Sequence, residues 1–241
     1  MICLKALQYT DGGVAFEGYL GYDDAVKRRR PGVLVIHDWT GVGPYTEKRV
    51  QQLAELGYIA LAADIYGKGV RPAGMEEAAD FANRYKADRP LLRSRANAGL
   101  RALQANSLVD TKRIAAIGYC FGGTAALELA RAGADIAGFV SFHGGLQTPT
   151  PDDAKNIKGK VLVLHGADDP HVPPNEVLAF EEEMRKARVD WQMIAYGGAV
   201  HSFTNPGAGD DPARGAAYNE KADKRSWKAM QVFCKEMLGA K

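Results

Sequence analysis

Short apolar runs alternate along the chain with longer stretches in which apolar residues recur at helical spacing. The first two runs, residues 2–9 and 14–20, flank Asp11-Gly12-Gly13 and predict a hairpin at the start of a sheet. The later apolar runs predict strands at residues 32–37, 58–63, 113–118, 136–142, 160–165 and 189–195. The stretches of helical spacing predict helices at residues 45–56, 76–85, 90–104, 124–132, 175–187 and about 216–237.

This order of elements predicts an α/β fold with a mostly parallel central sheet and an N-terminal antiparallel hairpin. Right-handed crossovers then place helices on both faces of the sheet, and ligands gather outside the carboxyl ends of the strands. The chain contains no internal repeat, linker or insertion long enough for a large cap domain, so we expect one domain over residues 1–241. The long loops 144–158 and 197–215 are candidates for the active site because each follows a predicted strand.

Charge, hydropathy and cysteine content argue against a nucleic-acid, membrane or metal partner. The formal net charge is only +2, and the basic run 27–30 has no interleaved aromatic residues, so we interpret this run as a solvated loop rather than a nucleic-acid site. No segment has the pattern of a signal peptide or the length of a membrane span, and we expect a cytoplasmic protein with no membrane partner. The 3 cysteines lack metal-ligand spacing, so we expect no disulfide, no metal and no cofactor. The sequence predicts no particular oligomeric state.

A thiol lies at the junction between a predicted strand and a predicted helix. Cys120 is the central residue of Gly118-Tyr119-Cys120-Phe121-Gly122-Gly123, which joins strand 113–118 to helix 124–132. A sharp strand-to-helix turn with small neighbours is typical of the nucleophile elbow of α/β hydrolases, where the usual nucleophile is serine. We interpret Cys120 as a nucleophile. The alternative is a small buried apolar residue beside glycines that pack the helix on the strand.

An acid and a base follow strand ends later in the chain. Asp169 ends a Gly-x-x-Asp turn after strand 160–165, where α/β hydrolases present the acid, whereas Asp168 is interpreted as a turn former. His201 follows the last predicted strand and precedes the last helix, so the order is nucleophile, acid, base. The remaining histidines are interpreted as loop-bonded or partly exposed residues: His37, His143, His165 and His171.

These residues predict a nucleophilic reaction at a carbonyl. His201 takes the proton of Cys120, Asp169 holds the imidazole in the required tautomer, and the thiolate attacks an ester or lactone. Backbone N–H groups stabilise the oxyanion, one from Phe121 and one from the loop after strand 32–37.

At this point the chain resembles the dienelactone hydrolase family of α/β hydrolases along nearly its whole length. The resemblance implies a triad of Cys120, Asp169 and His201, with the Trp39 N–H as the second oxyanion donor and a small ester or lactone as substrate. It also bears on Asp38, because well-known members have a glutamate there that contacts the resting nucleophile. The shorter Asp38 either reaches the thiol or caps a loop or helix. The motifs are 35–42, VIHDWTGV; 118–123, GYCFGG; 165–169, HGADD; and 201–203, HSF.

The same resemblance raises a question about the substrate. The prototype holds a substrate carboxylate with arginines, one of them a few residues after the catalytic histidine, where this chain has Thr204-Asn205-Pro206. Asn205 is therefore a candidate pocket residue, and preference for carboxylated lactones is in question. The arginines that could substitute are Arg71, Arg84, Arg93 and Arg95. The aromatic residues that either complete the core or line the pocket are Trp39, Tyr66, Tyr119 and Phe121.

Two other functions compete with the hydrolase hypothesis. The histidines and aspartates at strand ends could form a metal-dependent hydrolase, although their spacing matches no ligand motif. A non-enzymatic, redox-responsive or ligand-binding protein could use Cys120 as a sensor thiol, but such a sensor needs no general base.

Overall fold

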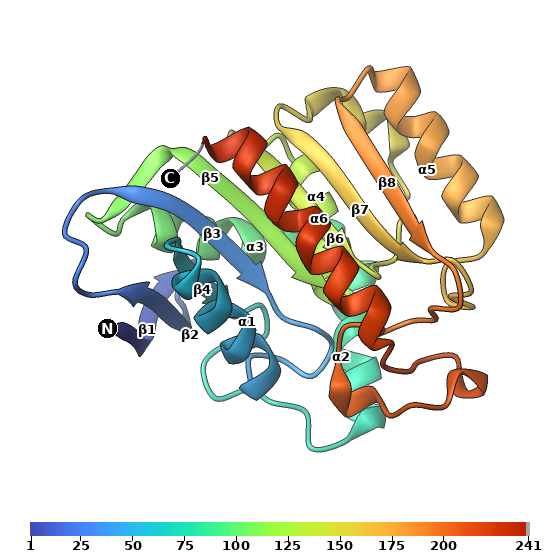
Figure 1. Ribbon diagram of the computed structural model, residues 1–241, viewed down its shortest axis with the longest axis horizontal. Coiled ribbons are helices and arrows are strands. Elements are labelled where there is room, and N and C mark those ends of the chain that lie inside the picture. The colour runs from blue at the N-terminus through green and yellow to red at the C-terminus, as the bar shows by residue number, and fades with distance from the viewer. Residues whose placement is uncertain (240–241) are drawn as a thin grey trace.

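The computed structural model describes residues 1–239, and its strands form one eight-stranded sheet in the order β1-β2-β4-β3-β5-β6-β7-β8 (Figure 1). The strands are β1 Ile2–Asp11, β2 Val14–Asp23, β3 Arg30–Ile36, β4 Ile59–Ala63, β5 Val109–Tyr119, β6 Gly138–Phe142, β7 Lys160–Gly166 and β8 Trp191–Tyr196. The α-helices are α1 Pro44–Glu55, α2 Met75–Ala87, α3 Arg89–Gln104, α4 Phe121–Arg131, α5 Pro174–Ala187 and α6 Glu220–Leu238. Three 3₁₀ turns complete the list: η1 Pro151–Asn156, η2 Pro206–Ala208 and η3 Pro212–Arg214.

The first two strands form the predicted hairpin, and the rest of the sheet is parallel. β2 pairs antiparallel with β1 and with β4, whereas each pair from β4 to β8 is parallel. The turn between β1 and β2 uses Gly12 and Gly13 at φ 54° and 78°, which a two-residue hairpin turn requires. The predicted α/β-hydrolase fold is therefore confirmed, and no cap covers the sheet in residues 1–239.

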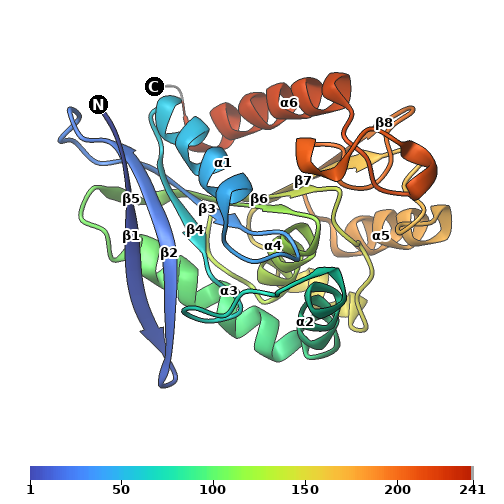
Figure 2. The same ribbon diagram turned by 90° about the horizontal axis from the view of Figure 1, so that it is seen from below.

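Helices bury both faces of the sheet because its central strands are apolar on both sides. Along β3, Val33 and Val35 pack with residues of α1 and α6, while Leu34 and Ile36 pack with residues of α3 and α4. Figure 2 shows α1 and α6 along one side of the sheet and α2, α3 and α4 on the other. A strand covered by helices on both faces has all of its apolar side chains buried. Burying one large apolar side chain stabilises the fold by about 1.5–3 kcal/mol.

The element boundaries differ from the sequence prediction at two points that matter for the site. α4 begins at Phe121, directly after the thiol, rather than at residue 124. α6 begins at Glu220, and the expected helical turn over 216–219 is wrong, because the backbone of residues 215–217 pairs with His201 instead. The Asn219 side chain then accepts a hydrogen bond from the Ala222 N–H and caps the helix.

The basic run 27–30 is only partly the solvated loop that the sequence predicts. Lys27, Arg28 and Arg29 are exposed, but Arg30 is the first residue of β3 and is buried. Among the helices of residues 1–239, none has both the length and the apolar character needed to cross a bilayer.

Candidate active site

Cys120 occupies a strained turn between β5 and α4. Its φ of 55° and ψ of −118° lie outside the regions that L-residues ordinarily adopt. The turn is possible because a Cβ on Gly118 would overlap the Gly122 carbonyl group, and a Cβ on Gly122 would overlap the Ile36 carbonyl oxygen. Glycine at both positions therefore allows the strand and the helix to approach closely enough to raise the thiol above the sheet edge.

Backbone strain in the molecule is concentrated around this thiol. Cys120, His143 and Ser202 have positive φ, and Arg188 at the end of α5 is the remaining non-glycine residue of this kind in residues 1–239. Each such residue costs on the order of 1–3 kcal/mol, so strain of this kind persists where the surroundings enforce it and is common at functional sites.

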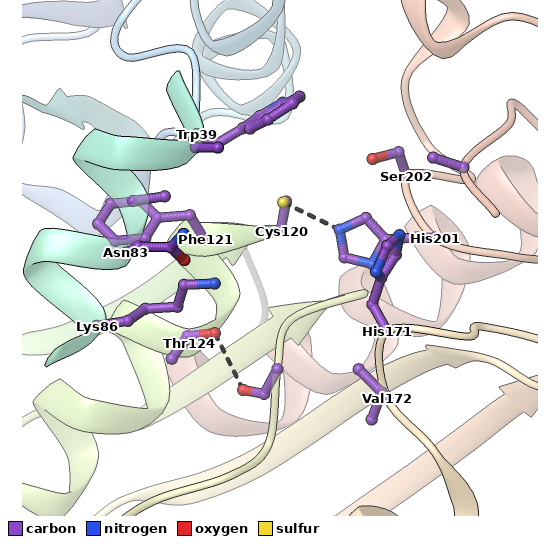
Figure 3. Close-up of a pocket in the computed structure, with 14 residues that line it drawn as sticks. Trp39, Asn83, Lys86, Cys120, Phe121, Thr124, His171, Val172, His201 and Ser202 are labelled. Atoms are coloured by element: carbon purple, nitrogen blue, oxygen red, sulfur yellow. Dashed lines mark hydrogen bonds between the residues drawn. The ribbon is translucent and has the colours of Figure 1, made fainter. Parts of the chain in front are cut away.

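The structure brings Cys120, His201 and Asp169 together from the ends of β5, β8 and β7. His201 Nε2 lies 3.0 Å from Cys120 Sγ, and His201 Nδ1 lies 2.8 Å from Asp169 Oδ2 (Figure 3). Because the carboxylate only accepts, Nδ1 carries the proton donated to it, and Nε2 faces the thiol. Asp169 is held in place by the His171 N–H, which donates to Oδ1 at 2.8 Å.

Electrostatics favour a charged imidazole beside the thiol. Burial lowers the pKa of His201, but the negative Cys120 thiolate and the Asp169 carboxylate outweigh burial and raise the pKa to about 10. The side chain of Asp169 is fully buried, so the carboxylate interacts with the ring in a medium of low dielectric constant. The protonated form of His201 is thus the stable one near neutral pH.

Two backbone N–H groups remain available beside the thiol. Within residues 1–239, the N–H groups of Trp39 and Phe121 make no hydrogen bond. Phe121 is the first residue of α4, where a helix leaves its N–H groups unsatisfied and adds the positive end of its dipole. The Tyr66 hydroxyl donates to the Trp39 carbonyl oxygen at 2.9 Å and fixes the loop after β3. These two N–H groups are suited to hold an oxyanion.

Asp38 caps its own loop. Its Oδ1 accepts hydrogen bonds from the N–H and the hydroxyl of Thr40, at 2.8 Å and 2.5 Å. No hydrogen bond between Asp38 and Cys120 occurs in the described chain. Of the two roles left open by the sequence, the geometry fits the loop cap.

His143 lies beneath the thiol in a buried polar chain. Its Nδ1 accepts from the Cys120 N–H at 3.2 Å, and its Nε2 lies 2.7 Å from Thr204 Oγ1, which is 2.6 Å from the Tyr45 hydroxyl. Burial lowers the pKa of His143 well below its ordinary value, so the ring is neutral and Nε2 donates to Thr204. Arg49 bonds both the Thr204 carbonyl oxygen and Asp223, at 2.8 Å and 2.7 Å, and extends this chain to α6.

The other histidines occupy different places. His37 is buried, accepts from the Ile65 N–H at 3.1 Å and donates to the Asp38 carbonyl oxygen. His165 is buried on β7, and burial lowers its pKa. His171 lines the cavity, with its ring centre 5.1 Å from that of His201. In residues 1–239 the histidine, cysteine and acidic side chains form no group with the geometry of a metal site.

A cavity of about 490 Å³ opens in front of the thiol. One wall comes from α2, through Ala79, Ala82, Asn83 and Lys86, and Figure 3 shows Lys86 and Asn83 across the cavity from His201. No pattern in the sequence predicts this wall. The spacing of the four residues places them on one helix face, but nothing in the sequence shows that this face meets the loop of Cys120.

Three predicted pocket residues do not line this cavity. Tyr119 is buried and packs with Tyr45 and Phe142 on the α6 side, because alternation along β5 turns it away. Tyr66 is buried below the Trp39 loop. Asn205 accepts from the Gly207 N–H at 2.9 Å and caps a 3₁₀ turn.

The arginines proposed as carboxylate ligands are also engaged elsewhere. Arg93 pairs with Glu128 and Asp153, Arg71 donates to backbone carbonyl groups, and Arg95 lies over the Phe16 ring. Arg84 is exposed on α2 and does not line the cavity. Lys86 contributes an ammonium group to the cavity lining.

Comparison with known proteins shows which family this chain resembles in sequence and structure. The family model of the dienelactone hydrolase family matches residues 16–238. The solved structure "m3DLH" is 42% identical, with a TM-score of 0.93 over 99% of both chains. A dienelactone hydrolase-like promiscuous phosphotriesterase, P91, from metagenomic libraries is 41% identical, with a TM-score of 0.92 over 99% of both chains. A probable 2-oxo-3-(5-oxofuran-2-ylidene)propanoate lactonase of Bradyrhizobium is 28% identical over 82% of this chain and 84% of that protein.

Proposed function

The chain belongs to the dienelactone hydrolase family, and from that premise we propose that it hydrolyses small carboxylic esters or lactones through a Cys120, His201 and Asp169 triad. The observation that supports this proposal most directly is the hydrogen-bonded line from Asp169 through His201 to Cys120 Sγ, with spacings of 2.8 Å and 3.0 Å. The strained turn directs the thiol into the cavity, where a substrate carbonyl can reach it.

The first half of the reaction forms an acyl-cysteine. The Cys120 thiolate attacks the carbonyl carbon, and the N–H groups of Trp39 and Phe121 stabilise the oxyanion of the tetrahedral intermediate. When the intermediate collapses, the bond to the leaving oxygen breaks and the His201 imidazolium gives that oxygen its proton. A lactone keeps the alcohol it releases tethered to the acyl group, whereas an open ester loses it.

The second half regenerates the enzyme. Neutral His201 takes a proton from a water molecule, which attacks the thioester through a second tetrahedral intermediate. The carbon–sulfur bond breaks, the acid leaves, and the thiolate again faces the protonated imidazole. Asp169 keeps Nδ1 protonated throughout, so Nε2 is always the atom that exchanges the proton.

The cavity favours a small substrate, and Lys86 favours a negatively charged one. A volume of about 490 Å³ lies within the range of small-molecule sites. Lys86 supplies a mobile ammonium group across from the thiol, in place of the arginine that the sequence lacks at Asn205. The Bradyrhizobium relative is named for a lactone that bears a carboxylate, which agrees with such a role.

Phosphotriesters are a second candidate class of substrate. The relative P91 is named as a promiscuous phosphotriesterase at 41% identity over 99% of this chain. In residues 1–239 no cap closes the cavity, so a bulky tetrahedral phosphoryl group has room beside the thiol. The same thiolate and N–H groups would then act on phosphorus instead of carbon.

Trapping the acyl-enzyme tests the proposal. Rapid acid quenching of a reaction with p-nitrophenyl acetate should yield an acetyl group on the peptide that contains Cys120. Cys120→Ala should lose both the adduct and turnover. Cys3→Ala is the matched control, because Cys3 is a half-buried thiol on β1, and it should keep both.

Other outcomes would contradict the proposal. Equal turnover by the wild type and Cys120→Ala would exclude Cys120 as the nucleophile. If no ester or lactone in a broad panel turned over while peroxide oxidised Cys120 stoichiometrically, a sensor thiol would become the better description.

A further inference from the structure

A second cavity, of about 420 Å³, lies at the amino-terminal end of β3. The active-site loop follows the other end of this strand, which spans about 20 Å between its first and last residues. In Figures 1 and 2 the loop that leads from β2 into β3 lies far from α2, which forms a wall of the active-site cavity. The two cavities are therefore separate.

The lining of this second cavity has an excess of positive charge. Its charged lining residues are Arg28, Arg29, Arg30, Arg113, Asp23 and Glu55. Asp23 accepts from the N-terminal amino group of Met1 at 2.8 Å, and Arg113 pairs with Asp110 at 2.7 Å. Within residues 1–239, Arg28 and Arg29 form no ion pair.

Arg30 is the unusual member of this group. The residue is only 4% exposed, yet its Nε, Nη1 and Nη2 atoms have no hydrogen-bond partner in the described part of the chain. Burial lowers the pKa of Arg30, but an arginine side chain keeps its charge in a protein. The nearby Asp23 carboxylate attracts Arg30 but accepts no hydrogen bond from it in the described part of the chain. A buried cation without hydrogen-bond partners is destabilising, and an anion in the cavity would remove that penalty.

We propose that this cavity binds the phosphate group of a small phosphate monoester. The planar fork of Arg30 can hold two phosphate oxygens at once, and the neighbouring Arg28 and Arg29 match a dianion better than a singly charged carboxylate. Ile2, Val26 and Tyr58 also line the cavity and offer apolar surface to the organic part of the ligand. This site is independent of the ester chemistry at Cys120.

Calorimetric titration at constant ionic strength tests the proposal, with phenyl phosphate, inorganic phosphate and benzoate as probes and sodium chloride as the background. Phenyl phosphate should bind more tightly than inorganic phosphate, and benzoate should bind most weakly. Arg30→Met should weaken phenyl phosphate binding roughly tenfold or more, because charged hydrogen bonds are lost. Arg185→Met is the matched control, since Arg185 is an exposed arginine paired with Glu181 on α5, and it should bind as the wild type does.

Arg28→Gln with Arg29→Gln provides a second test on exposed residues, which leaves the core of β3 unchanged and should also weaken phenyl phosphate binding. Inorganic phosphate that bound as tightly as phenyl phosphate would overturn the monoester assignment, and equally tight benzoate would overturn the phosphate assignment. Wild-type affinity in Arg30→Met would overturn the site. Hydrolysis of p-nitrophenyl acetate by Arg30→Met should stay within about twofold of the wild type, so this proposal and the esterase proposal fail separately.

Discussion

Two buried polar clusters in this molecule both contain charged side chains, but only one of them has unbonded groups that face a cavity. The ion cluster of Arg131, Glu128 and Glu183 lies between α4 and α5, and Arg131 is fully buried. Its guanidinium nitrogens all have partners: both oxygens of Glu183, one oxygen of Glu128 and the Leu146 carbonyl oxygen. The cluster around Cys120 is different, because it faces a cavity and leaves two backbone N–H groups unbonded.

The difference lies in how completely each cluster satisfies its charges and hydrogen-bonding groups. In the ion cluster each charge is neutralised by a fixed partner, so a ligand would have nothing to bind. The Cys120 sulfur has His201, held by Asp169, on one side and the cavity on the other. The strained turn keeps the sulfur in this position. Buried charge is common to both clusters, and unsatisfied hydrogen-bonding groups beside a cavity distinguish the cluster around Cys120.

The largest expected effect concerns the acid. Asp169→Asn should lower kcat/KM for p-nitrophenyl acetate by about 10³–10⁴-fold, because an amide neither holds the Nδ1–H tautomer nor stabilises the imidazolium. Asp168→Asn is the matched control. Asp168 accepts a hydrogen bond from the Gly198 N–H at 2.9 Å and, within residues 1–239, makes no hydrogen bond to His201, so kcat/KM should change little. An equal loss in the two variants would remove Asp169 from the triad.

The next effect should appear in stability alone. Arg131→Met leaves Glu183 buried without its cation, whereas Glu128 keeps its ion pair with Arg93, and it should lower the free energy of unfolding by about 3–5 kcal/mol. Urea unfolding measures it, and kcat/KM of the folded variant should stay near that of the wild type. The exposed Arg185→Met should cost less than about 1 kcal/mol. A large loss of kcat/KM in folded Arg131→Met would mean that the two clusters are coupled.

The third effect concerns the charge on the imidazole. Cys120→Ser replaces a thiolate by a neutral hydroxyl, so the pKa of His201 should fall from about 10 toward its ordinary value of about 6.5. The direction follows because a negative neighbour favours the protonated ring and a neutral one does not. NMR titration of the His201 ring measures the change. If the pKa stayed near 10 in the serine variant, Asp169 alone would be responsible for the raised value.

A smaller effect should appear in the pH dependence of stability. Burial lowers the pKa of His143, so below pH 6.5 the unfolded chain binds a proton that the folded chain does not. The free energy of unfolding therefore falls as the pH drops, by about 1.4 kcal/mol per pH unit for each such histidine. His143→Gln should remove one histidine's share of this slope, measured by urea unfolding between pH 6.5 and 5. An unchanged slope would show that His143 is protonated in the folded chain.

The smallest effect should be on substrate preference. Lys86→Met should raise KM for an ester that bears a carboxylate by roughly 2- to 5-fold, since exposed charge pairs contribute about 0.2–1 kcal/mol. KM for the neutral p-nitrophenyl acetate should not change. Arg84→Met is the matched control on the same helix, because Arg84 is exposed outside the cavity. A parallel rise in KM for both esters would indicate a steric role for Lys86.

The sequence predicts the residues that directly follow strands and misses those defined by packing between distant elements. Apolar runs mark the ends of β5, β7 and β8, so Cys120, Asp169 and His201 can be found from the chain alone. His143 contacts Thr204, 61 residues later, and no local pattern indicates that pair. Lys86 is missed for the same reason, because its cavity is formed by several separate loops.

Two errors follow from features that are visible in the sequence. Tyr119 is two residues after Ile117 on one strand, so strict alternation would have placed it with Ile117 on the α6 face instead of in the pocket. The basic run 27–30 predicts an exposed Arg30, and this prediction is wrong. The apolar strand that begins at Arg30 has a stronger influence on burial than the charge of its neighbours.

The wall of the active-site cavity that α2 supplies has an evolutionary consequence. Ala79, Ala82, Asn83 and Lys86 lie in one segment of 8 residues, whereas the proposed reacting groups lie at the ends of strands inside the sheet. A few substitutions in this segment can therefore change substrate preference without disturbing the strand-to-helix turn at Cys120. Relatives that share one chemistry can differ in substrate through substitutions on the cavity-lining face of a single helix.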